Sequence, residues 1–124
     1  MTNGELFPRR RCSVVFSEDE KFRYLLERRW SRGKRTLLWV MLNPSTATSE
    51  IDDPTIRRCI GFALQDFDRM LVCNLFAYRS TNPGVLPHVA DPVGPGNDRT
   101  ILGCARRSQK VVVAWGADEF ARDR

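Results

Sequence analysis

The chain has 124 residues with seven Phe and three Trp, which is enough apolar material for one domain with its own core. Twenty Lys and Arg against fifteen Asp and Glu give a formal net charge of +5, which favours anionic partners such as nucleotides or nucleic acid. No run approaches the roughly 18 apolar residues that span a bilayer, and the polar start lacks the apolar core of a secretory signal. We therefore expect one cytoplasmic domain over residues 1–124, flexible at 1–11 and without membrane contact, in an oligomeric state that the sequence leaves open.

The positive charge is concentrated near the amino end. It comes from three consecutive arginines at 9–11 and from a second group, namely Arg28, Arg29, Arg32, Lys34 and Arg35. Charge runs of this kind are most often solvated, so we expect an exposed surface there rather than a binding stripe.

The cysteines are far apart, and each has apolar neighbours: Cys12, Cys59, Cys73 and Cys104. There is no C-x-x-C pair, and the single histidine is His88, so a structural zinc site is not expected. The pattern favours buried free thiols in a reducing compartment.

The first predicted elements form a hairpin. Residues 12–16 are a short β-prone run, residues 22–30 have the mixed character of a half-exposed strand, and the polar residues 17–20 supply the turn. The next run, 36–42, is almost continuously apolar, as in a strand that is covered on both faces. We predict that it is the central strand.

A helix is predicted to follow a loop after this strand. Asp53 suits the N-cap and Pro54 the first helical position. Apolar residues then recur at helical spacing, at Ile56, Ile60, Ala63, Leu64 and Phe67.

Alternation of strands and helices continues with a buried strand at 70–73, a helix at 97–107, a strand at 110–115 and the start of a third helix. The proline-rich segment 76–96 cannot be regular structure for long. The order predicts an α/β fold, a three-layer sandwich with a mostly parallel central sheet and an N-terminal antiparallel hairpin.

Three strand ends carry the candidate site, because ligands of parallel sheets bind beyond the carboxyl ends of the strands. Asn43 and Asp53 are the candidate catalytic residues, with Asn43 orienting a base and Asp53 assisting directly or through water. The candidate substrate-binding residues offer amide, hydroxyl, aromatic and cationic groups, and they are Pro44, Ser45, Thr46, Asn74, Phe76, Arg79, Trp115 and Gly116.

Each candidate also has a purely structural interpretation. Asn43 and Ser45 can cap a turn around Pro44, Asn74 can satisfy loop backbone, and Asp53 can serve only as a helix cap. Their occurrence at successive strand ends favours a site for the set as a whole.

Other chemistries are less favoured. His88, in the proline-rich segment, could act as a general base, but most lone loop histidines are simply exposed. Asp52 and Asp53 lack a third carboxylate at ligand spacing for magnesium. The 94–96 Gly-Pro-Gly run has no following Gly-Lys-Ser/Thr, which excludes a P-loop. We expect no cofactor and no metal.

A series of motifs supports a family resemblance. In order they are Met41 to Ala47, Asp53 to Thr55 with Arg58 and Cys59, Asn74 to Thr81, Pro92 to Gly94 with Asn97 and Asp98, and Ala114 to Gly116. Over about residues 12–117 the chain resembles the bacterial and phage domain-of-unknown-function family numbered 1643. That resemblance brings no established activity.

The layout is also similar, more distantly, to the uracil-DNA glycosylase superfamily. Asn43-Pro44 would match its first motif, and Asn74 with Arg79 its second. The resemblance implies an enzyme that takes a base out of the nucleic-acid stack. The late His-Pro motif of that superfamily does not occur before Arg124, so the chain resembles a fragment or a shortened member.

Three functions are consistent with these features. The first is a glycosylase-like enzyme acting on a nucleobase or nucleotide, with Phe76 stacking on the base. The second is a non-catalytic module that binds nucleotides or nucleic acid with the same loops and the basic amino-terminal region. The third is a partner-binding fragment that presents an exposed sheet edge.

Overall fold

The structure is a computed structural model that describes residues 11–124. Of the segment expected to be flexible, 1–11, all but Arg11 lies outside the described residues. Five strands form one sheet, and they are β1 (Arg11–Phe16), β2 (Arg23–Arg29), β3 (Thr36–Met41), β4 (Arg69–Asn74) and β5 (Lys110–Ala114). Between and after them lie the helices α2 (Pro54–Ala63), α3 (Asn97–Arg107) and α4 (Glu119–Arg122), and the 3-10 helix η1 (Pro83–His88).

The sheet has the order β1-β2-β4-β3-β5 and is mixed. Strands β3, β4 and β5 are parallel, whereas β1 pairs antiparallel with β2, and β2 pairs antiparallel with β4. The predicted hairpin is confirmed, but the prediction of a mostly parallel sheet is wrong. The hairpin is part of the sheet because Leu26, fully buried and paired with Val72, gives β2 an apolar contact to the central strands.

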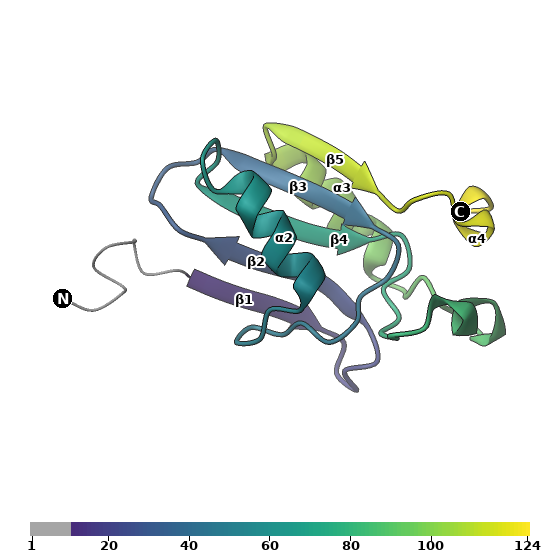
Figure 1. The fold of residues 1–124 in the computed structure, drawn as a ribbon. Helices are drawn as coiled ribbons and strands as arrows, with labels where there is room; N and C mark the ends of the chain where they lie inside the picture. Colours follow the sequence, from purple (N-terminus) through teal and green to yellow (C-terminus); the bar gives the residue numbers. More distant parts are fainter. Residues whose placement is uncertain (1–10) are drawn as a thin grey trace.

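The two longer helices cover opposite faces of the sheet (Figure 1). Beneath α2, Ile56 packs with Trp39 and Met70. Beneath α3, Cys104 packs with Leu38 and Leu71. The α/β class and the helix layers on both faces therefore follow the prediction, although only one full-length helix covers each face.

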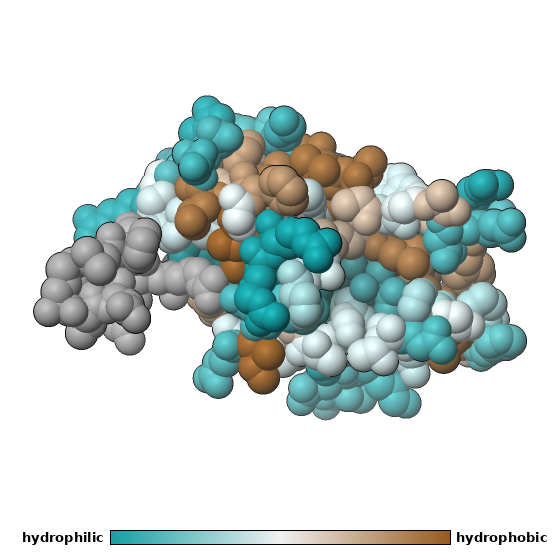
Figure 2. All heavy atoms as spheres, in the orientation of Figure 1, coloured by the Kyte–Doolittle hydropathy of each residue, from teal (hydrophilic) through white to brown (hydrophobic). Residues whose placement is uncertain are grey.

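Strand β5 forms one edge of the sheet and is poorly covered. Val111 and Val113 are 45% and 58% exposed, and on α2 the nearby Phe62 is 70% exposed. Figure 2 shows apolar side chains along the upper part of the molecule, where β5 runs. Among residues 11–124, no helix combines the length and apolarity needed to cross a membrane.

The loops after β3 and β4 lead to opposite faces of the sheet. The first, residues 42–53, runs to α2, and the second, residues 75–96, runs to α3 (Figure 1). Neighbouring parallel strands whose connections diverge in this way create a topological switch point, where open α/β sheets bind ligands. In this fold that point lies between the carboxyl ends of β3 and β4.

Candidate functional site

The loops after β3 and β4 lie side by side and are joined by hydrogen bonds. The Leu75 amide donates to the Met41 carbonyl at 2.9 Å, and the Ser80 amide donates to the Pro44 carbonyl at 2.9 Å. Asn43 adds a side-chain link, since its Nδ2 donates to the Ser80 carbonyl at 2.8 Å. The structure therefore brings the first two of the three predicted strand-end segments together.

Within the first segment, the side chains have different environments. Pro44 is buried, Ser45 is half-buried and Thr46 is exposed. The Asn43 Nδ2 is used in backbone contacts, whereas its Oδ1 accepts no hydrogen bond from the described residues. Asn43 thus has a structural role and keeps one acceptor available.

Asp53 caps α2 as its position in the sequence predicts. Its Oδ1 accepts the Ile56 amide at 2.8 Å, and Pro54 occupies the first helical turn. The second carboxylate oxygen has no hydrogen-bond donor within residues 11–124. The structural interpretation of Asp53 is therefore correct, and a further chemical role of Asp53 stays a prediction.

Asn74 ends β4 on the face covered by α2, because its partner across the ladder, Met41, packs into the cluster beneath that helix. The Asn74 side chain is 1% exposed, and its Nδ2 has no hydrogen-bond partner. Its carbonyl accepts the Nδ2 of Asn97 at 2.8 Å, and Asn97 also donates to Leu75 at 3.0 Å. Asn97 thus fixes the start of α3 to the end of β4. It lies in a motif of the family resemblance, but the sequence predicted no role for it.

Phe76 and the third segment have other surroundings. The ring of Phe76 is buried and stacks on Phe120, with 4.7 Å between the centroids. A base could stack on that face only by replacing Phe120. Trp115 belongs to the cluster beneath α3 and lines a cleft of about 410 Å³ that α3 shares with α4, and Gly116 is exposed with a φ of 73°.

Arg23 is a residue of this region that sequence reasoning missed. Its side chain is on the α2 face, is 2% exposed and donates from Nη1 to the Ala47 carbonyl at 3.1 Å. Its Nε is buried without a partner, and within the described chain the guanidinium makes no ion pair. Burial lowers the pKa of Arg23 to about 10, while the negative charge of Asp53 acts in the opposite direction.

A β-bulge explains why this arginine faces α2. Phe16 pairs with Arg23 and Val15 with Leu25, so Tyr24 is an extra residue in β2. Strict alternation from Leu26 would turn Arg23 to the other face. The bulge itself packs against Gly94, whose φ is 90° and where a Cβ would lie 3.1 Å from Tyr24. No local sequence signal predicts such an irregularity.

Arg79 lies on the same side. Its guanidinium carbon is 4.5 Å from the centroid of the Phe16 ring, and its Nη1 donates to the Glu20 carbonyl at 3.1 Å. The Glu20 carboxylate is 4.0 Å away and exposed, and the Arg79 Nε is buried without a partner. The positive charge of Arg79 contributes to the lowered pKa of Arg23, behind burial.

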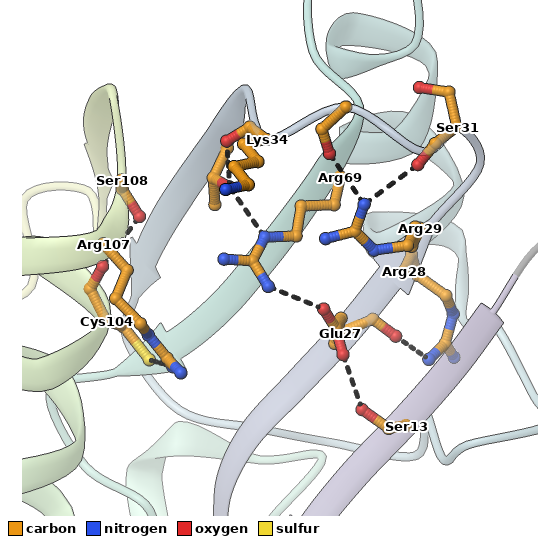
Figure 3. A network of polar contacts seen from close by, with 12 residues as sticks. Ser13, Glu27, Arg28, Arg29, Ser31, Lys34, Arg69, Cys104, Arg107 and Ser108 are labelled. Carbon is orange, nitrogen blue, oxygen red and sulfur yellow. Dashed lines mark hydrogen bonds and ion pairs between the residues drawn. The ribbon is translucent and has the colours of Figure 1, made fainter.

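Arg28, expected to be solvated, is fully buried, so that expectation is wrong. Its Nε forms an ion pair with Asp52 at 2.8 Å, and its other nitrogens donate to the carbonyls of Glu27 at 3.0 Å, Ile51 at 3.3 Å and Thr48. Figure 3 shows the bond from Arg28 to the Glu27 carbonyl, whereas the Glu27 carboxylate links Ser13 to Arg69. Arg28 is therefore a clamp that holds the second half of the 42–53 loop on the sheet.

The remaining candidates contribute little to this region. His88 is exposed at the end of η1. No group of three or more potential metal ligands occurs among the residues that the structure describes. Cys59, Cys73 and Cys104 are buried free thiols as predicted, and Cys12 is half-buried.

The fold and this region define a small α/β domain with a mixed five-stranded sheet and a polar cluster at the switch point between β3 and β4. A family model described as Protein of unknown function (DUF1643) matches residues 23–124, so the chain belongs to that family. No curated protein and no solved structure matches the chain. The more distant similarity to uracil-DNA glycosylases is not confirmed by these comparisons and stays a prediction.

Proposed function

We propose that this protein binds a nucleotide or nucleobase at the junction of β3 and β4, with the side-chain amides of Asn43 and Asn74 reading the base. The observation that carries the proposal is the buried Asn74 Nδ2, which has no partner at the switch point. A buried donor without an acceptor is costly, and a base carbonyl would satisfy it. Asn43 Oδ1 supplies an acceptor from the adjoining loop, and amides that offer both groups suit the hydrogen-bonding edge of a base.

Titration of the four nucleosides and their 5′-monophosphates into the native protein and the Asn74→Ala variant tests the proposal. The loss of a paired base contact, worth about 1–3 kcal/mol, should weaken binding roughly tenfold or more. Asn82→Ala is the matched control, because Asn82 is exposed and serves only to cap η1. Equal affinities for the native protein and the Asn74 variant, or no binding by the native protein, would refute the assignment.

Hydrolysis of an N-glycosidic bond is the catalytic form of this proposal. Water would add to the anomeric carbon, and the base would leave with the bonding electron pair and take up a proton. Asp53 could accept the water proton only at its second oxygen, because Oδ1 already accepts the Ile56 amide. Asp53→Asn keeps the helix cap and removes the charge. Release of free base by the native protein but not by Asp53→Asn would support catalysis, whereas binding without release would favour a non-catalytic module.

A partner-binding role has one observation in its favour. Strand β5 leaves Val111 and Val113 exposed at the sheet edge, and unpaired edges invite association. Light scattering tests this role, since a monodisperse monomer at all concentrations would argue against self-association through β5.

A further inference from the structure

The guanidinium of Arg23 is buried but mostly unpaired. An arginine side chain has five N–H donors. In Arg23, one of them reaches the Ala47 carbonyl, and the Nε donor has no acceptor. With its side chain 2% exposed, the group cannot exchange these missing partners for bulk water.

Arg28, five positions after Arg23, provides an internal reference, because both side chains point to the α2 face of β2. Arg28 is equally buried, yet it has an acidic partner and several carbonyl acceptors. Burial in this fold therefore does not by itself leave an arginine without partners. Of these two arginines of β2, Arg23 has a buried donor without a partner and Arg28 does not.

The electrostatic surroundings of Arg23 favour an anion. Asp53 is close enough to raise the pKa of Arg23 but forms no ion pair with it, and the charge of Arg79 opposes it. The carboxylate of Asp53 is engaged in capping α2, and the Glu20 carboxylate, 4.0 Å from Arg79, is exposed. An isolated buried cation is costly, and a bound anion would compensate it.

Three buried atoms without a partner at this end of the sheet are donors, namely the Nε of Arg23, the Nε of Arg79 and the Nδ2 of Asn74, whereas the Oδ1 of Asn97, an acceptor without a partner among the described residues, lies at the start of α3. The missing species is therefore rich in acceptors as well as anionic. An oxyanion has both properties, and its oxygens match the planar fork of a guanidinium.

A short stretch of the 42–53 loop covers these donors. Asn43 and Pro44 are tied to Ser80, and the Arg28 clamp holds Thr48 and Ile51. Between these anchors, Ser45 and Thr46 make no hydrogen bond to the described residues, whereas Ala47 is attached both by its bond from Arg23 and by its side chain, which is fully buried in the cluster beneath α2. An oxyanion on Nη1 would have to displace the Ala47 carbonyl while the Ala47 side chain stays packed.

We propose that Arg23, with Arg79, forms an oxyanion site beneath residues 45–47 that takes the phosphoryl group of a nucleotide. The proposal rests on the proposed function, because it names the group that the same strand-end site would recognise beside the base.

Isothermal titration of three probes tests the site: inorganic phosphate, the nucleosides and the nucleoside 5′-monophosphates. Arg23→Gln should weaken monophosphate binding at least tenfold, about the effect of losing a hydrogen bond to a charged group, and should change nucleoside binding much less. Arg58→Gln, which removes one exposed charge from α2, is the matched control and should leave all affinities nearly unchanged.

The outcomes separate this inference from the proposed function. If nucleosides and monophosphates bind the native protein and Arg23→Gln equally, the oxyanion site is refuted while base recognition stands. If phosphate binds in an Arg23-dependent manner and no nucleoside binds, the oxyanion site stands while base recognition fails. If phosphate and monophosphates do not bind, or if Arg23→Gln lowers Tm as much as Arg28→Gln, Arg23 is a structural residue and the inference is overturned.

Discussion

Arg28 and Arg23 lie on one strand and one face, yet their surroundings differ. The guanidinium of Arg28 forms an ion pair with Asp52 and donates hydrogen bonds to three backbone carbonyls. Around Arg23, the residues that the structure describes supply one acceptor, the Ala47 carbonyl. The comparison shows that two equally buried arginines of this protein can differ widely in the number of partners that they have. The number of partners distinguishes Arg28, which holds a loop on the sheet, from Arg23, for which we propose a ligand.

The largest expected effect is on the Arg28 side of this comparison. Arg28→Met removes the ion pair to Asp52 and the donor that Arg28 gives to the carbonyls of Thr48 and Ile51. Breaking a buried pair of this kind costs about 3–5 kcal/mol. Urea denaturation of the variant should show this loss, with Arg58→Met as an exposed control that changes stability by less than about 0.5 kcal/mol. A loss below about 1 kcal/mol would contradict the clamp.

Asn97 is expected to have the next largest effect. Its amide joins α3 to the end of β4 through Asn74 and Leu75, and its side chain is fully buried. Asn97→Ala removes the donor of the Asn74 carbonyl, at about 1–3 kcal/mol, while the Leu75 carbonyl keeps its bond from the Nε of Arg124. Thermal unfolding should show the loss, and ligand affinity should fall with it if Asn97 positions Asn74. Unchanged stability would mean that water replaces the amide.

A smaller effect on stability is expected at Asp53. Two substitutions distinguish the contribution of its helix cap from that of its negative charge. Asp53→Ala should cost about 1 kcal/mol because the Ile56 amide loses its acceptor, whereas Asp53→Asn should cost little. The difference is measured as the free energy of unfolding in urea. Equal losses in both variants would show that the charge near Arg23, rather than the cap, is what Asp53 contributes to stability.

The smallest expected effect is on Arg23 itself. Arg23→Met keeps most of the side-chain volume and removes a buried charge that lacks a counter-ion, so stability should stay within about 1 kcal/mol of the native value or rise. The same urea series measures it beside Arg28→Met. A loss as large as that of Arg28→Met would remove the distinction between the two arginines.

Local signals predicted much of this structure. Asp53 and Pro54 marked the start of α2 because capping depends on adjacent residues, and the apolar run at 36–42 marked β3. The helix ends at Ala63, before the apolar positions Leu64 and Phe67 that were assigned to it. The α/β class followed from the order of these elements.

The errors concern contacts between distant residues. The pairing of β2 with β4 joins residues at least 40 positions apart. The burial of Arg28 depends on a loop more than 20 positions further along, and the charge pattern around Arg28 resembles an exposed surface. Arg23 was missed for a related reason, because a register shift between two strands decides its direction. The candidate region at Asn43 and Asn74 was accessible from sequence only through the general rule that ligands bind at strand ends.

The bulge at Tyr24 makes the direction of Arg23 depend on the number of residues in β2 rather than on their identity. Removing one residue there would restore regular alternation and turn Arg23 toward α3. The guanidinium would be unchanged, but it would lie on the opposite face of the sheet. Substitutions at Tyr24 leave that count unchanged. With the extra residue in β2, the Arg23 guanidinium faces the backbone of the 42–53 loop. Without that residue, it would lie under α3.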